Sequence, residues 1–187
     1  MPASHSSSLA LVWLVAQFEA RHLKASTLTP THLLLGLCKI VDLDLTELVS
    51  KSAPDRDAVL EESLREVRKL RNVFRTAGVD AKQLRRALRK PDPEQDFDLA
   101  KSEQIRRSPA AKRIFATAER IAELGGGVVY PVHLLYATLE AEDAHRDATL
   151  AKLEFDKNRL LSVAKRQVIT PAIGTHSGSK EARARWN

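Results

Sequence analysis

The 187-residue chain has one cysteine, seven glycines and few aromatic residues, which make up 5 % of the sequence. Its lone cysteine, Cys38, cannot form a disulfide within the chain, which suits a reducing compartment. An apolar run at residues 9–16 has no basic segment before it and passes into a helix with charged residues, which argues against a signal peptide. Because no stretch of about 18 apolar residues occurs, we expect a cytoplasmic protein without a membrane partner.

The motifs of nucleotide and metal chemistry are also missing. Without a Gly-x4-Gly-Lys-Ser/Thr phosphate loop, the chain is not expected to bind or hydrolyse ATP by itself. The triple glycine at 125–127 has no strand before it and no Lys-Ser/Thr after it, so we interpret it as a turn. No cysteine or second histidine stands three or four residues from His32 or His133, and Cys38 lies on a different helix face from His32. We therefore predict no catalytic residue, no metal, no cofactor and no enzymatic activity of this chain alone.

The residues that are plentiful favour helices. Leu, Ala, Arg and Glu lose little rotamer freedom in a helix, and 43 % of the chain is hydrophobic against 29 % charged. The net charge of +6 is unevenly placed: residues 63–90 hold ten Lys or Arg and two acids, between acidic stretches at 42–62 and 91–103. We interpret the basic run as a solvated helix face.

One segment occurs twice. Thr29-Pro-Thr-His-Leu-Leu-Leu-Gly-Leu37 returns as Tyr130-Pro-Val-His-Leu-Leu-Tyr-Ala-Thr138, 101 residues later. Each proline suits the first turn of a helix, and each histidine is interpreted as packing or capping in that turn. Thr29 is a good N-cap and Tyr130 a poor one. The same offset, without gaps, aligns the preceding apolar stripes and predicts Ser7 and Ser108 as their N-caps. It pairs Trp13 with Ile114, Ala16 with Thr117, Ala20 with Ile121, and Leu23 with Leu124.

A further helix closes each copy, after Asp80 in the first and Asp156 in the second, and both aspartates are predicted N-caps. The offset there is 76, so the first copy carries about 25 additional residues, assigned to an inserted helix at about 57–76. The predicted fold is all-α, with two pseudo-symmetric repeats of about four helices and an extra helix in the first. The expected boundaries are 1–90 for the first repeat, 91–104 for a linker, 105–169 for the second repeat, and 170–187 for a flexible tail or linker.

These motifs resemble the N-terminal repeat of Clp-type AAA+ unfoldases. That repeat has an amphipathic helix, a Thr-x-Glu-His-Leu-Leu-x-Ala-Leu helix, a short helix, and a closing helix after a Gly-Val-Asp step. The match lies in 29–37 with Gly78-Val79-Asp80, and again in 108–124, 130–139 and 155–156, so it covers roughly residues 8–168.

The resemblance implies a docking domain that binds unfolded or tagged substrates, or an adaptor, beside the AAA+ ring of a parent protein. The chain is then expected to be the N-terminal part of a longer protein. Thr31, Leu35, Val132 and Tyr136 are the candidate residues of a groove between the repeats, although core packing is the competing interpretation for Leu35 and Tyr136. Family members that recognise phosphorylated arginine have an acidic residue directly before each histidine. Here these positions are Thr31 and Val132, so that recognition mode is not carried over.

Two alternatives remain. The chain could act as a separate double-repeat accessory protein of a Clp protease. It could instead bind nucleic acid through the basic segment 65–90, but no recognition motif or stacking aromatic residue accompanies this segment.

Overall fold

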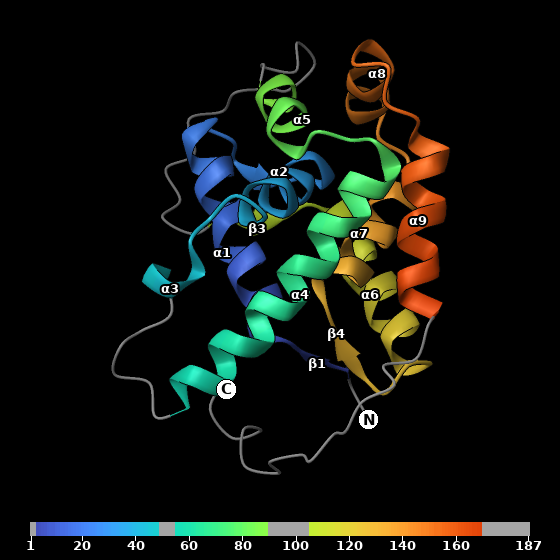
Figure 1. The fold of residues 1–187 in the computed structure, drawn as a ribbon. Helices are drawn as coiled ribbons and strands as arrows, with labels where there is room; N and C mark the ends of the chain where they lie inside the picture. Colours follow the sequence, from blue (N-terminus) through green and yellow to red (C-terminus); the bar gives the residue numbers. More distant parts are fainter. Residues whose placement is uncertain (1–2, 49–54, 90–104, 170–187) are drawn as a thin grey trace.

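The computed structural model describes residues 3–48, 55–89 and 105–169, whose regular elements are helices apart from four two-residue strands (Figure 1). The first repeat contains β1 Ser4–His5, α1 Ser7–His22, β2 Thr27–Leu28, α2 Pro30–Ile40, α3 Leu45–Leu48, α4 Arg56–Ala77 and α5 Ala81–Leu88. The second contains β3 Arg106–Arg107, α6 Pro109–Glu123, β4 Val128–Val129, α7 Pro131–Glu140, α8 Ala144–Lys152 and α9 Lys157–Ile169. The predicted all-α repeat fold is confirmed. The predicted linker at 91–104 and tail at 170–187 lie outside the described residues.

A serine caps the first helix of each repeat. Ser108 Oγ accepts a hydrogen bond from the Ala111 N–H at 3.1 Å, as predicted. For α1, however, the cap is Ser6, whose Oγ accepts from the Leu9 N–H at 3.2 Å, and Ser7 is the first helical residue. The prediction of Ser7 was therefore wrong by one residue, and the two repeats are 102 residues apart at this point.

This spacing of 102 holds to the last turn of both helices. The Ala25 N–H donates to Ala20 O, and the Gly127 N–H donates to Ala122 O in the same way. The first repeat then has one more residue before its second strand, which restores the offset of 101. The gapless alignment of the first helices was therefore wrong. The structure replaces the pairs Trp13–Ile114, Ala16–Thr117, Ala20–Ile121 and Leu23–Leu124 by Trp13–Phe115, Ala16–Ala118 and Ala20–Ala122.

The strands connect the two repeats to each other. β1 pairs in parallel with β4, with Ser4 opposite Val128, and β2 pairs in parallel with β3, with Leu28 opposite Arg107. Because β1 and β3 precede the first helix of their repeats, each repeat gives its first strand to the other one. One hydrophobic core extends through both repeats.

The helix predicted at about 57–76 is α4. Its C-terminal turn has the Val79 N–H bonded to Phe74 O, and the turn after α8 has the Phe155 N–H bonded to Leu150 O, 76 residues later. The packing is also exchanged, since α4 lies against α9 and α8 lies against α5. Thus α4 is the longer counterpart of α8, and the first repeat adds α3 and the first turns of α4.

Helices α2 and α7 occupy the centre of the molecule. Gly36 allows α1 and α2 to touch: a Cβ at this position would lie 2.8 Å from Val12 O and 3.0 Å from the Ala16 Cβ. The corresponding residue of α7 is Ala137, which is buried. The first repeat therefore packs its two leading helices backbone against backbone, whereas the second leaves space for a methyl group.

Candidate docking surface

The two recurrent histidines complete the N-terminal caps of α2 and α7. The Thr29 N–H donates to His32 Nδ1 at 3.1 Å, and the Tyr130 N–H donates to His133 Nδ1 at 3.0 Å. A histidine thus takes the position that Glu or Gln occupies in a capping box. Burial lowers the pKa of each histidine to about 4, so both rings are neutral at pH 7. The prediction that they pack or cap in the first turn is confirmed.

The four candidate groove residues lie mostly inside the molecule. Leu35 is fully buried, and Val132 and Tyr136 are 5 % and 9 % exposed. The Tyr136 hydroxyl donates to Glu140, and this bond together with burial raises the pKa of Tyr136 to about 12. Only Thr31 is half-exposed. The structure therefore assigns Leu35 to the core and leaves it no surface for a partner.

Neighbouring helices explain this burial. Thr31, Leu35 and Cys38 share one face of α2 by helical spacing. The Thr31 hydroxyl donates to Asp143 Oδ2 at 3.0 Å, and Asp143 is the N-cap of α8. Helix α5 also packs against α2. On the symmetric side, α4 and α9 cover α7. Four helices thus cover the seam where sequence reasoning placed the groove.

An arginine caps the C-terminal end of each central helix. In the first repeat the exposed Arg71 donates to Val41 O through Nε, at 3.2 Å, and through Nη2. In the second repeat Arg146 is 0 % exposed, and it donates to Thr138 O through Nη1 and to Ala141 O through Nη2, the latter at 2.7 Å. The residue of α4 that corresponds to Arg146 is Leu70, so the two arginines make equivalent contacts from neighbouring positions.

The outward face of α1 is apolar. Leu14 is 49 % exposed and Phe18 is 64 % exposed, one helical turn later, and the half-buried Leu11 and Val15 lie beside them. Sequence reasoning considered only the opposite, buried face of this helix. The sequence nevertheless contained a signal for this exposed face. A helix with apolar residues on nearly every side can bury only one side in the core, so another apolar side is left for a second contact.

The corresponding face of α6 is polar. At the spacing of 102 residues, Arg113, Ala116, Thr117 and Arg120 replace Leu11, Leu14, Val15 and Phe18. Leu124, which is 90 % exposed, is the other large apolar residue at the described surface, and it stands alone at the end of α6. Single exposed leucines are ordinary, whereas an exposed apolar stripe marks a candidate interaction site.

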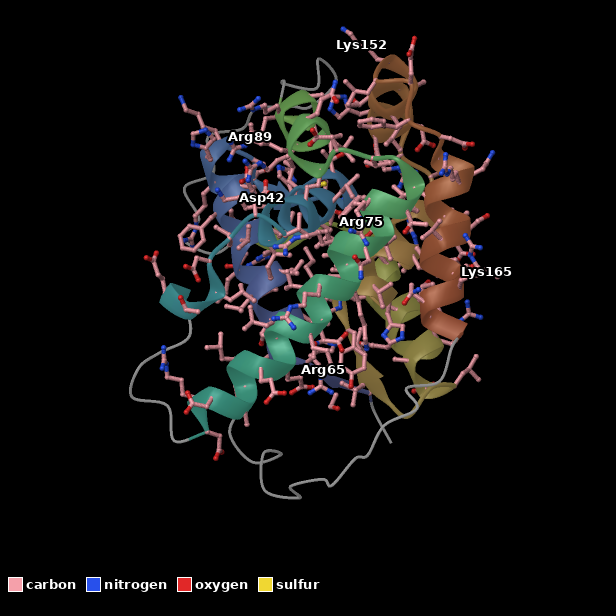
Figure 2. All side chains as sticks on the ribbon, viewed as in Figure 1. Asp42, Arg65, Arg75, Arg89, Lys152 and Lys165 are labelled. Carbon is pink, nitrogen blue, oxygen red and sulfur yellow. The ribbon has the colours of Figure 1, made fainter. Side chains whose placement is uncertain are left out.

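Two regions of the described surface are each rich in charge of one sign. Figure 2 shows Arg65 and Arg75 along α4 and Lys165 on the neighbouring α9, and the exposed Arg68 and Arg159 extend this basic face. In α5, Arg85 is buried, and Arg89 forms a bidentate pair with Glu19 at 2.6 and 2.7 Å, so the basic face is narrower than the segment 65–90 suggested. The acidic region comprises exposed residues around α3 and the start of α4: Asp42, Asp44, Glu47, Asp55, Asp57 and Glu61.

Two distinctive polar side chains of the first repeat, Cys38 and Arg85, are buried. Cys38 is fully buried, and burial raises the pKa of its thiol well above the usual range. The Nε and Nη1 atoms of Arg85 are buried without a hydrogen-bond partner among the described residues. In the same part of the chain, no group of three or more His, Cys, Asp or Glu side chains could hold a metal ion. None of the described helices has the length and apolar character needed to cross a bilayer.

No protein-family model and no curated protein match the chain. Solved structures do match it. It is 14 % identical to the Hsp104 N-terminal domain from Candida albicans, with a TM-score of 0.61, over 88 % of this chain and 91 % of that one. For the N-terminal domain of the chaperone ClpD from Arabidopsis thaliana the identity is 19 %, the TM-score 0.57, and the coverage 88 % and 94 %. For a chain from a study of a malarial protein secretion system the identity is 16 %, the TM-score 0.57, and the coverage 88 % of this chain and 95 % of that one. The chain has the fold of these N-terminal domains, and the resemblance drawn from its two motifs is confirmed for the fold.

Proposed function

We propose that this chain is the docking domain of a Clp-type ATP-dependent unfoldase and binds substrate polypeptides or an adaptor without catalysing a reaction. The fold carries the proposal: two helical repeats with exchanged first strands match chaperone N-terminal domains over nearly their whole length. Function does not follow from fold alone, so the proposal depends equally on the surface. That surface offers an apolar helix face and two charged regions, which are features of binding.

Recognition of phosphorylated arginine is left out of the proposal. The position before His32 is Thr31, whose hydroxyl already bonds to Asp143, and the position before His133 is the buried Val132. Asp143 is also engaged, since Oδ1 accepts from the Arg146 N–H at 2.9 Å and Oδ2 accepts from Thr31. A guanidinium ligand would need a free carboxylate here, and this one is occupied twice.

Binding of an unfolded polypeptide tests the proposal. The full chain is titrated into fluorescein-labelled β-casein and, separately, into a labelled DNA duplex, and fluorescence anisotropy is measured at two salt concentrations. We expect saturable binding to casein in the micromolar range. No saturable binding to casein, together with DNA binding that collapses as salt rises, would favour the basic face of α4 and α9 as a nucleic-acid site instead.

Attachment to an ATPase module and action as a separate accessory protein of a Clp protease predict the same binding. The coding sequence after the codon for Asn187 separates these two arrangements. A phosphate-loop motif there would support the first, and a stop codon would support the second.

A further inference from the structure

We propose that the outward face of α1 is the docking surface, and that it takes a cationic polypeptide segment with large apolar side chains. The inference deepens the proposed docking function and rests on it. The surface consists of Leu11, Leu14, Val15 and Phe18, called the α1 face below.

The exposed part of the α1 face, Leu14 and Phe18, lies outside the core, whereas Leu11 packs against it. The internal repeat provides the control, because α6 occupies the equivalent place with the same N-cap and the same terminal turn. There, Arg113 and Arg120 take the places of Leu11 and Phe18, and both are exposed. Since a polar face serves this position equally well, the apolar residues of α1 require another explanation. When water-exposed apolar surface occurs on one of two equivalent helices and not on the other, it indicates that a partner binds there.

The α3 and α4 side of the α1 face favours a positively charged partner there, whereas the guanidinium of Arg107 lies over the Trp13 ring on the other side. On one flank of α1, Trp13 packs edge-on against Phe115 of α6, with ring centroids 5.6 Å apart. On the other flank lies α4, which contacts α1, and α3 contacts α4 in turn (Figure 1). The residues around α3 and the first turns of α4, from Asp42 to Glu61, carry the six exposed acids of the acidic region together with the partly exposed Arg56, whereas the later turns of α4 carry the basic face.

This acidic flank belongs to the elements that the first repeat adds. Both α3 and the first turns of α4 lack a counterpart in the second repeat. The apolar stripe and the acids of α3 and the first turns of α4 therefore occur together in one repeat, and neither has an equivalent in the other. A segment with apolar anchors and lysines or arginines complements both features, whereas an acidic segment would be repelled. Arg21 and His22 at the C-terminal end of α1 limit the cationic contact to the α3 and α4 side.

Two fluorescein-labelled helix-forming peptides test the inference, one of leucine and lysine, the other with glutamate in place of each lysine. We expect the full chain to bind the lysine peptide at least about tenfold more tightly at low salt. Phe18→Ser should weaken that binding by about tenfold, because a phenylalanine is no longer buried in the complex. Arg120→Ser, at the equivalent position of α6, is the matched control and should change it less than about twofold. Asp57→Asn combined with Glu61→Gln should weaken lysine-peptide binding and flatten its salt dependence.

Equal affinity for the two peptides would overturn the inference, and so would lysine-peptide binding that survives Phe18→Ser. A dimer in sedimentation that dissociates in the Phe18→Ser variant would show that the α1 face binds a second copy, which also overturns it. Circular dichroism checks that each variant is folded, which the exposure of the substituted side chains favours. The casein titration keeps the two proposals apart. If the unmodified chain and the Phe18→Ser variant bind casein equally well and neither binds the lysine peptide, the docking function stands and its surface lies elsewhere.

Discussion

The two repeats use the same positions for different residue chemistry. The first has a glycine where two helices touch and a glycine after α4, and the second has an alanine and a glutamate in the corresponding places. The end of the central helix is capped by an exposed arginine in the first repeat and by a buried arginine, from the neighbouring position, in the second. The hydrogen bonds made there are nevertheless equivalent. The two repeats therefore supply partners for similar backbone groups with different residues, and we expect these residues to differ in their contribution to stability.

The buried arginine should give the largest difference between the repeats. Arg146→Leu copies the leucine found at position 70 and leaves Thr138 O and Ala141 O without their donors in a buried site. We expect the free energy of unfolding to fall by about 3 kcal/mol, measured by urea denaturation with circular dichroism. Arg71→Leu removes the exposed equivalent and should lower it by less than about 1 kcal/mol. Equal losses would show that burial does not distinguish the two caps.

The two histidines should act alike in acid. Their folded pKa of about 4 lies below the unfolded value of 6.5, so the unfolded chain takes up protons first as the pH falls. Their contribution to stability is complete above pH 6.5 and is lost between pH 6.5 and about 4, at about 1.4 kcal/mol per pH unit for each ring.

His32→Gln and His133→Gln test this separately, because a glutamine can still accept the N-cap hydrogen bond. Each variant should lose about half of the histidine-dependent slope in urea denaturations between pH 7 and pH 4. If the pH dependence of the free energy of unfolding changed in only one variant, the two histidine caps would not be equivalent.

Gly36 tests the tighter helix contact of the first repeat. Gly36→Ala places a Cβ 2.8 Å from Val12 O, so α1 and α2 must move apart, and we expect a loss of about 2 kcal/mol in thermal or urea unfolding. The reverse change in the second repeat, Ala137→Gly, removes a methyl group from a contact with room for it and should lower stability by about 1 kcal/mol. If Gly36→Ala left the free energy of unfolding unchanged, α1 and α2 would be able to move apart as easily as α6 and α7.

The smallest effect should come from the turns after α4 and α8. Gly78 has φ 76° and Glu154 has φ 58°, so a glutamate takes the left-handed conformation that suits glycine. Glu154→Gly should raise the free energy of unfolding by about 1 kcal/mol, and Gly78→Ala should lower it by a similar amount. If Glu154→Gly destabilised the protein instead, the side chain of Glu154 would be making a contact that outweighs the backbone strain.

Local features of the fold could be read from the sequence because they depend on neighbouring residues. Asp80 and Asp156 are N-caps as predicted: Asp80 accepts from the Lys82 and Gln83 N–H groups at 2.8 and 3.0 Å, and Asp156 accepts from the Arg159 N–H at 3.0 Å. Ser6, by contrast, stands in a run of three serines, any of which could cap by its chemistry. Two-residue strands lack any periodicity that a sequence could show.

The site could not be read in the same way. Thr31 and Leu35 share one face of α2, but which elements cover that face is decided by residues far along the chain, such as Asp143 and those of α5. The exposure of Phe18 has the same origin, since its helix looks equally apolar on every side. Comparing the two repeats residue by residue would have revealed the difference, provided that the offset of 102 had been used.

The exchanged strands also bear on how the chain folds as it leaves the ribosome. Ser4 and His5 are synthesised first, but their partners Val128 and Val129 follow only after the whole first repeat and α6. The N-terminal strand must therefore wait unpaired during most of synthesis, and the first repeat emerges with its end unfinished. A nascent chain halted before β4 should be open to proteases at β1, and synthesis of β4 should then protect it, after β3 has already paired with β2.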